Sequence, residues 1–528
     1  MYSHYRINYF TCIAILGLDT LKSLFSEQTA TTQKFSPWER LRKETIPLAL
    51  RWCSEFEYII QSQSNLRQLL INDCNLVCVA LYIPERRFLD NSLVQQGAQS
   101  SLKTYLQEAK IQQIINGNPY ALLMNEDWLT LTDAAQFGVT DKKVKPLRVA
   151  AEYKETDADT LHVVFTAEGC HVFMDELGVY DKETIIQNID DLRSRLSLLS
   201  INLTHIEQST VCNHAFGMQF VEHIDFVPRG NRISADGIAI TKHCYDHNIM
   251  VDVKHMSLAA RLHLYELRNS GALGTNLPPI VATHVGFTGI SVQQIPDYIL
   301  DYKRYSNGRY TMLLQGKPVK YYTREASPCF NASSINLYDE DIMAILQSGG
   351  MIGISLDKRI LGYQQYNPRA EYDFPVEKEY VSYEEEDLFL PSQQGAEIGN
   401  AFLNEACMDW EEVRNGGTVY PQLGDYHLRH FMAHIVHVIA VARTHNYEVS
   451  KALKQLCIGS DMDGMINPMY YCMTYDDIYY LQQAFEKQFV SFAKEVKVQL
   501  PAGFDVKAFS QDLFFRNGRD FVLGRLGG

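Results

Sequence analysis

The stretch Asn248–Asn269, NIMVDVKHMSLAARLHLYELRN, passes from an apolar run directly into a helical pattern. The run NIMVDVKH (Asn248–His255) is short and nearly continuous in apolar residues, as is typical of a strand buried on both faces of a parallel sheet. Ser257 then offers a hydroxyl at the N-cap of the helical segment SLAARLHLYELRN. The stretch therefore predicts one β-α unit of a parallel α/β fold.

Similar runs recur along the chain, and helical patterns separate several of them. The runs are Asn8–Leu16, Asn75–Ile83, Leu161–Gly169, Ser197–His205, Asn248–His255, Pro278–His284, Gly349–Leu356 and Gln455–Asp461. Strands that alternate with helices eight times predict a (β/α)8 TIM-type barrel. An open doubly wound sheet is the alternative, but no glycine-rich dinucleotide fingerprint follows any of the runs.

Three connections are too long for simple barrel turns, at about residues 85–150, 285–348 and 357–426. The last two leave the C-terminal ends of the sixth and seventh predicted strands, where barrel enzymes build their pockets. We expect one domain, residues 1–528, that carries these loop insertions.

Composition excludes several classes of protein. Lys and Arg total 48 against 63 Asp and Glu, a net charge of −15 without basic runs, which argues against a nucleic-acid partner. No apolar run approaches the ~18–20 residues of a membrane helix. The 11 cysteines are unpatterned, which favours reduced thiols in the cytoplasm. A signal peptide is the alternative for the first apolar run, but Asp19 and Lys22 follow it at once.

Polar residues stand where five of the runs end. They are Glu168, His205, His255, His284 and Asp461. Each has an ordinary structural explanation alone, but the C-terminal ends of barrel strands converge on one rim. Carboxylate oxygen and imidazole nitrogen are ligands that Zn²⁺ accepts, so the rim predicts a zinc site. There Asp461 would take the proton of a zinc-bound water and pass it to a leaving amine.

Five segments in this order resemble the motifs of the membrane (renal) dipeptidase family of zinc peptidases, in the amidohydrolase superfamily. They are FTAEGCH, INLTH, VDVKHMS, PPIVATHVG and CIGSDMDGM. The resemblance runs from about residue 160 to the end of the chain and implies a (β/α)8 barrel. It implies that Glu168 bridges two zinc ions and that His255 and His284 complete the second zinc site.

The resemblance further implies that His205 contacts the substrate and the tetrahedral intermediate, and that Asp461 is the acid/base. Asp463 would support the turn beside it. The family also has two metal ligands on the first strand, and the alignment places Ile13 and Ile15 at those positions. Isoleucine cannot coordinate a metal, so one zinc ion is expected, with two as the other possibility.

The leading hypothesis is a zinc-dependent hydrolase of dipeptides or similar small amides with a reduced, single metal site. The alternative is a catalytically lapsed barrel that binds a ligand or partner. No arginine directly precedes the helical segment Ile335–Leu346, where the family binds the substrate carboxylate, so dipeptide specificity is open. A homodimer is expected only because dimers are common in the family.

Overall fold

A computed structural model of the chain describes a defined part of its residues. The described ranges are 4–6, 63–86, 112, 114–124, 139–217, 226–230, 232–305, 309–319, 328–362, 376–390, 420–464 and 466–527. Within these ranges, no helix combines the length and apolar character that crossing a bilayer requires.

The centre of the molecule is a sheet whose eight main strands are parallel and follow one another in chain order. The strands are β1 (His4–Arg6), β2 (Leu76–Leu81), β4 (Thr160–Ala167), β5 (Leu198–Asn202), β6 (Met250–Asp252), β7 (Val281–Val285), β10 (Met351–Ile354) and β12 (Leu456–Ile458). A ninth strand, β3 (Lys143–Pro146), pairs with the first half of β4. This order is that of a (β/α)8 barrel, so the predicted fold class is confirmed.

The described part of the first strand precedes the run predicted for it. β1 pairs in parallel with β2 through His4, Tyr5 and Arg6, whereas the sequence pattern favoured Asn8–Leu16, a segment that lies outside the described residues. β1 does not form an apolar run, because its three residues are polar or aromatic. Five of the other seven main strands fall within predicted runs; β4 begins one residue before its run, at Thr160, and β7 ends one residue after its run, at Val285.

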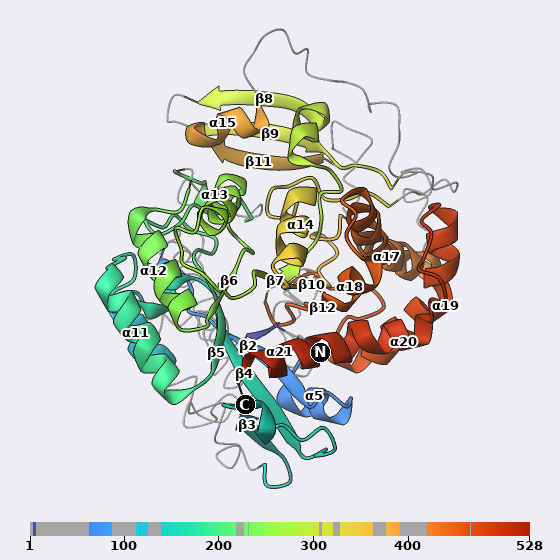
Figure 1. The fold of residues 1–528 in the computed structure, drawn as a ribbon, viewed down its shortest axis with the longest axis horizontal. Coiled ribbons are helices and arrows are strands. Elements are labelled where there is room, and N and C mark those ends of the chain that lie inside the picture. The colour runs from blue at the N-terminus through green and yellow to red at the C-terminus, as the bar shows by residue number, and fades with distance from the viewer. Residues whose placement is uncertain are drawn as a thin grey trace, which may run out of the picture.

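Helices cover the outside of the sheet, with α11 to α13 on the left and α17 to α20 on the right of Figure 1. The described helices are α5 (Leu66–Ile71), α9 (Pro119–Leu122), α11 (Lys182–Arg195), α12 (Ala235–Asp246), α13 (Leu258–Asn269), α14 (Asp339–Gln347), α15 (Glu386–Phe389), α17 (Tyr420–Thr444), α18 (Val449–Lys454), α19 (Ile478–Glu495), α20 (Val506–Gln511) and α21 (Asn517–Arg525). Ser257 caps α13 as expected, accepting the N–H of Ala260. The apolar face of α11 is turned toward the sheet side of the fold, with Ile185 and Ile189 buried.

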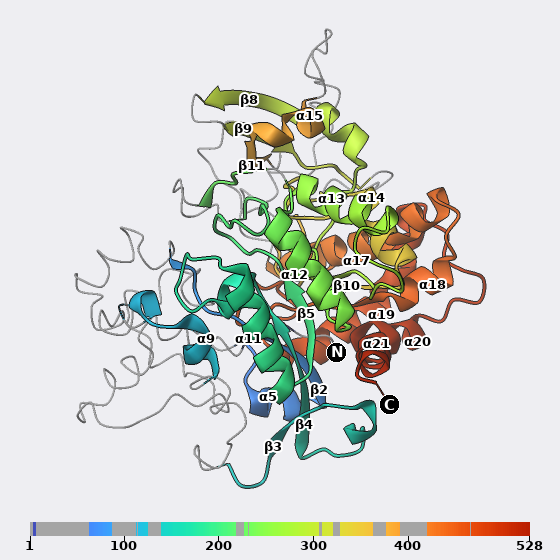
Figure 2. The same ribbon diagram turned by 60° about the vertical axis from the view of Figure 1, so that its left-hand side comes forward.

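The predicted insertions at about residues 285–348 and 357–426 contain a second sheet. β8 (Ile299–Tyr305), β9 (Arg309–Gln315) and β11 (Val376–Ser382) form an antiparallel sheet in the order β11-β9-β8. Figures 1 and 2 both show this small sheet beyond α13 and α14, together with α15. Glu379 of β11 holds it to the body of the protein by accepting the N–H of Ser334 at 2.6 Å.

The described cysteines are mostly buried thiols. Cys74, Cys78, Cys170, Cys212, Cys244, Cys457 and Cys472 are free. Cys329 is disulfide-bonded, so the expectation of reduced thiols is wrong at this position. The spacing of cysteines along a chain does not report which of them the fold brings together.

A buried ion pair joins α13 to α14. Arg261 and Asp341 are both 0% exposed, and the Nη2 of Arg261 lies 3.0 Å from Oδ2 of Asp341. The Nη1 of Arg261 also donates to the carbonyls of Met256 at 2.8 Å and Ser334 at 2.9 Å. Met256 follows His255 directly, so this guanidinium fixes the loop that leaves β6.

Replacing Arg261 with methionine is expected to lower the free energy of unfolding by roughly 3–5 kcal/mol, because Asp341 would be left buried without a counter-charge. Arg232→Met is the matched control, since its pair with Glu266 is exposed on both sides (54% and 66%). That control is expected to change stability by less than about 1 kcal/mol. Denaturant unfolding of both variants checks the difference, and equal effects would contradict the role given to Arg261.

Candidate metal centre

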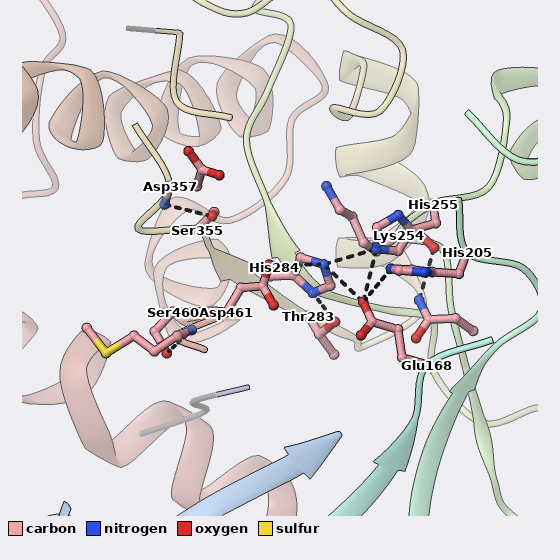
Figure 3. Close-up of polar contacts among 12 residues, drawn as sticks. Glu168, His205, Lys254, His255, Thr283, His284, Ser355, Asp357, Ser460 and Asp461 are labelled. Atoms are coloured by element: carbon pink, nitrogen blue, oxygen red, sulfur yellow. Dashed lines mark hydrogen bonds and ion pairs between the residues drawn. The ribbon is translucent and has the colours of Figure 1, made fainter. Parts of the chain in front are cut away.

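The structure brings together the polar residues that end the parallel strands. Glu168 directly follows β4, His205 and His255 each lie three residues beyond β5 and β6, and His284 lies within β7. Figure 3 shows the three imidazoles converging on the carboxylate of Glu168. Asp461, three residues beyond β12, lies beside His284. All five are buried.

The distances define a compact cluster. Oε1 of Glu168 lies 3.1 Å from Nε2 of His255, 3.3 Å from Nε2 of His205 and 3.6 Å from Nε2 of His284. The Nε2 atoms of His255 and His284 are 3.2 Å apart. Three imidazole nitrogens therefore surround one carboxylate oxygen. This donor set suits Zn²⁺, which binds imidazole and carboxylate, so the residues present fit the metal that the sequence predicts.

His205, predicted to contact the substrate and the tetrahedral intermediate, lies as near to the carboxylate of Glu168 as the two predicted histidine ligands do. The atoms that Glu168, His205 and His255 offer a metal lie within 4.8 Å of one another. The predicted ligand set was Glu168, His255 and His284. The geometry thus offers two overlapping three-residue sets, and the division of roles between His205 and His284 stays a prediction.

Thr283 fixes the orientation of the imidazole of His284. Its Nδ1 lies 3.0 Å from Oγ1 of Thr283, and that hydroxyl donates to the carboxylate of Asp252. Because the hydroxyl proton goes to Asp252, Oγ1 is left to accept the Nδ1 proton, which leaves a lone pair on Nε2 for a metal. Burial raises the pKa of Asp252 to about 7. Asp252 also accepts the N–H of Lys254 at 2.9 Å, so its role is structural.

His205 is held by a carboxylate that the sequence analysis missed. Its Nδ1 contacts Oε1 of Glu85, and the hydroxyl of Tyr82 donates to Oε2 of Glu85 at 2.7 Å. Burial disfavours ionisation of Glu85, but His205 and His171 outweigh it and lower its pKa to about 2. Burial also favours neutral His205, but Glu85 and Glu168 outweigh it and raise its pKa to about 9.

Burial, then the charge of His205, lowers the pKa of His255 well below its ordinary value. The directions of these pKa shifts favour a protonated His205 beside a neutral His255. A neutral imidazole is the form that coordinates metals.

The loop after β12 holds Asp461 in an unusual backbone conformation. Its φ is +52°, and its Oδ2 lies 3.8 Å from Nε2 of His284. A Cβ on Gly464 would lie 2.2 Å from Oδ1 of Asp461, so only glycine fits there. The carboxylate of Asp463 accepts the N–H groups of Gln63 at 2.7 Å and Ser64 at 3.0 Å. Asp463 thereby ties the loop to the segment before α5. The supporting role given to Asp463 beside Asp461 stays a prediction.

Lys254, the residue before His255, places a buried amine beside the cluster. It is 2% exposed, and its Nζ has no hydrogen-bond partner among the described residues. In Figure 3 its side chain runs past His284 on the side of Asp357. Burial lowers its pKa to about 8, against the opposing attraction of Asp461 and Asp357. Its charge offsets the repulsion among the carboxylates of this rim.

The predicted replacement of the strand-one ligands, Ile13 and Ile15, falls outside the described residues. The described part of the first strand is β1, His4–Arg6, which precedes both positions. The register that places the isoleucines at ligand positions therefore stays a prediction.

Comparison with known proteins gives matches among solved structures. No family model and no curated protein matches the chain. A metallo peptidase from Rhodobacter sphaeroides, bound to a phosphinate mimic of the dipeptide L-Ala-D-Ala, is 15% identical with a TM-score of 0.45. The probable dipeptidase PvdM from Pseudomonas aeruginosa is 12% identical with a TM-score of 0.44, and the metallo peptidase dipeptidase AC, of peptidase family M19, is 14% identical with a TM-score of 0.42. Each match covers 88% of this chain and 90% of the other.

Proposed function

We propose that the chain is a metal-dependent hydrolase of dipeptides or similar small amides, with one zinc ion held by Glu168, His255 and His284. The observation that carries the proposal is the convergence of one buried carboxylate oxygen and three imidazole nitrogens, 3.1–3.6 Å from that oxygen, at the C-terminal ends of β4 to β7. In a barrel this is the end at which active sites are built. A zinc ion bound there would polarise the amide carbonyl and lower the pKa of a bound water.

The side chains of this rim supply the remaining chemistry. Asp461, on the far side of His284 from Glu168, would accept the proton of the attacking water and deliver it to the leaving nitrogen. His205, held by Glu85, would donate a hydrogen bond to the substrate oxygen as negative charge develops there. Thr283 and Asp252 would keep His284 in the tautomer that presents Nε2.

Metal analysis and a hydrolysis assay on the purified protein test the proposal together. We expect about one tightly bound zinc per chain, release of amino acids from a panel of dipeptides, and loss of both on chelation with recovery when zinc is restored. Absence of tightly bound metal would refute the zinc-dependent hydrolase. Bound zinc without turnover of any dipeptide or small amide would favour the lapsed, ligand-binding barrel instead.

A further inference from the structure

A second group of metal-ligating side chains lies on the outer surface of the protein, on the two helices that flank β5. The group consists of Asp190 on α11, His243 on α12 and His247, which caps the C-terminus of α12. One atom from each of the three side chains lies within 4.8 Å of the others. The metal centre described above is buried at the strand ends, so this surface cluster is a separate feature.

The helix places the two histidines together because residues four apart lie on the same face. Their ring centroids are 4.3 Å apart. Nδ1 of His247 donates to the backbone carbonyl of His243 at 2.8 Å, which fixes the tautomer and leaves a lone pair on Nε2. Metal-ligating histidines commonly use their other ring nitrogen in this way.

The carboxylate comes from the neighbouring helix. α11 packs against α12, and Oδ1 of Asp190 lies 3.0 Å from Nε2 of His243. Two ligand atoms at ~2.0–2.1 Å from a zinc ion, in a tetrahedral arrangement, are about 3.3 Å apart. If the side chains of Asp190 and His243 move apart by a few tenths of an ångström, the ion therefore fits between them. Arg193 competes for this carboxylate, since its Nη1 also lies 3.0 Å from Oδ1.

We propose that Asp190, His243 and His247 bind a divalent transition-metal ion, of which Zn²⁺ is the representative, and that the ion links α11 to α12. Two imidazoles and one carboxylate favour zinc, nickel, cobalt or copper over calcium and magnesium, which prefer oxygen ligands. Asp190 and His247 are exposed, so water completes the coordination. The inference does not depend on the proposed hydrolase.

Zinc titration followed by calorimetry tests the surface cluster. We expect the unmodified protein to bind one more equivalent of zinc than the double variant His243→Ala, His247→Ala. The single variants should bind that equivalent at least about tenfold more weakly. Zinc should also raise the melting temperature of the unmodified protein more than that of the double variant. His445→Ala, which removes an exposed histidine elsewhere, is the matched control and should change neither result.

A second variant separates metal binding from a merely structural role of the cluster. Arg193→Ala removes the competing guanidinium, so it should tighten zinc binding at the surface cluster by roughly two- to fivefold. Equal numbers of zinc equivalents in the unmodified protein and the double variant would overturn the proposal. So would an unchanged affinity in Arg193→Ala, because Arg193 is the neighbour that must be displaced from the carboxylate.

Discussion

The His255→Ala variant is expected to lose its tightly bound zinc, with an affinity at least about 100-fold weaker than that of the unmodified protein. Removing an outer partner of a metal ligand already costs about 10- to 100-fold, and His255 is itself placed as a ligand. Its Nε2 lies closer to Oε1 of Glu168 than the other imidazoles do. Removing it would leave Glu168, His205 and His284 without the nitrogen between them.

Metal content after dialysis, measured by mass spectrometry, checks this result. The variant is best made in the background His243→Ala, His247→Ala, so that zinc carried over on the surface cluster at Asp190 is not counted with the buried ion. His445→Ala in the same background is the matched control and should keep one zinc per chain. If His255→Ala also keeps its zinc, the ion is held by another set of residues. Folding is followed by circular dichroism, because His255 has a φ of +70° that alanine tolerates poorly.

The sequence predicts this rim well because it depends on strand ends. In parallel strands, the residue at which an apolar run stops lies at the same edge of the sheet in every strand, and that edge collects Glu168, His205, His255 and His284. The order of the strands follows from the same runs. The runs do not report the distances between the side chains at their ends. His205 lies 3.3 Å from Glu168 and His284 lies 3.6 Å from it, so spacing along the chain does not separate a ligand from its neighbour.

Other features escaped prediction for identifiable physical reasons. Glu85 stands two residues beyond the second run, where the same strand-end rule applies, but it is also the first residue of the predicted insertion at 85–150. β11, VEKEYVS, carries the charged residues Glu377, Lys378 and Glu379 in succession and belongs to a small antiparallel sheet, so it contains no continuous apolar run. Lys254 interrupts a run with a charge, and only the three-dimensional structure shows that its amine is buried.

The Asp461→Asn variant is expected to keep its zinc while kcat for dipeptide hydrolysis falls by roughly 10²- to 10⁴-fold. An amide cannot accept a proton from the attacking water, yet it has nearly the shape of the carboxylate. Oδ2 of Asp461 is 3.8 Å from Nε2 of His284, farther than any distance from Oε1 of Glu168 to the three imidazoles, so the metal ligands stay in place. The acidic limb of the pH–rate profile should also disappear in the variant.

The matched control for this prediction is Asp463→Asn, two residues away on the same loop. Its carboxylate accepts hydrogen bonds from the N–H groups of Gln63 and Ser64 and, at 3.1 Å, from the hydroxyl of Ser64. This variant should therefore lower the melting temperature. Its kcat, measured at a temperature at which it is folded, should fall much less than that of Asp461→Asn. Kinetic assays with metal analysis on both variants distinguish the two aspartates. A rate for zinc-loaded Asp461→Asn within a few-fold of the unmodified protein would remove Asp461 as the proton acceptor, since a proton relay that needs this carboxylate cannot run without it.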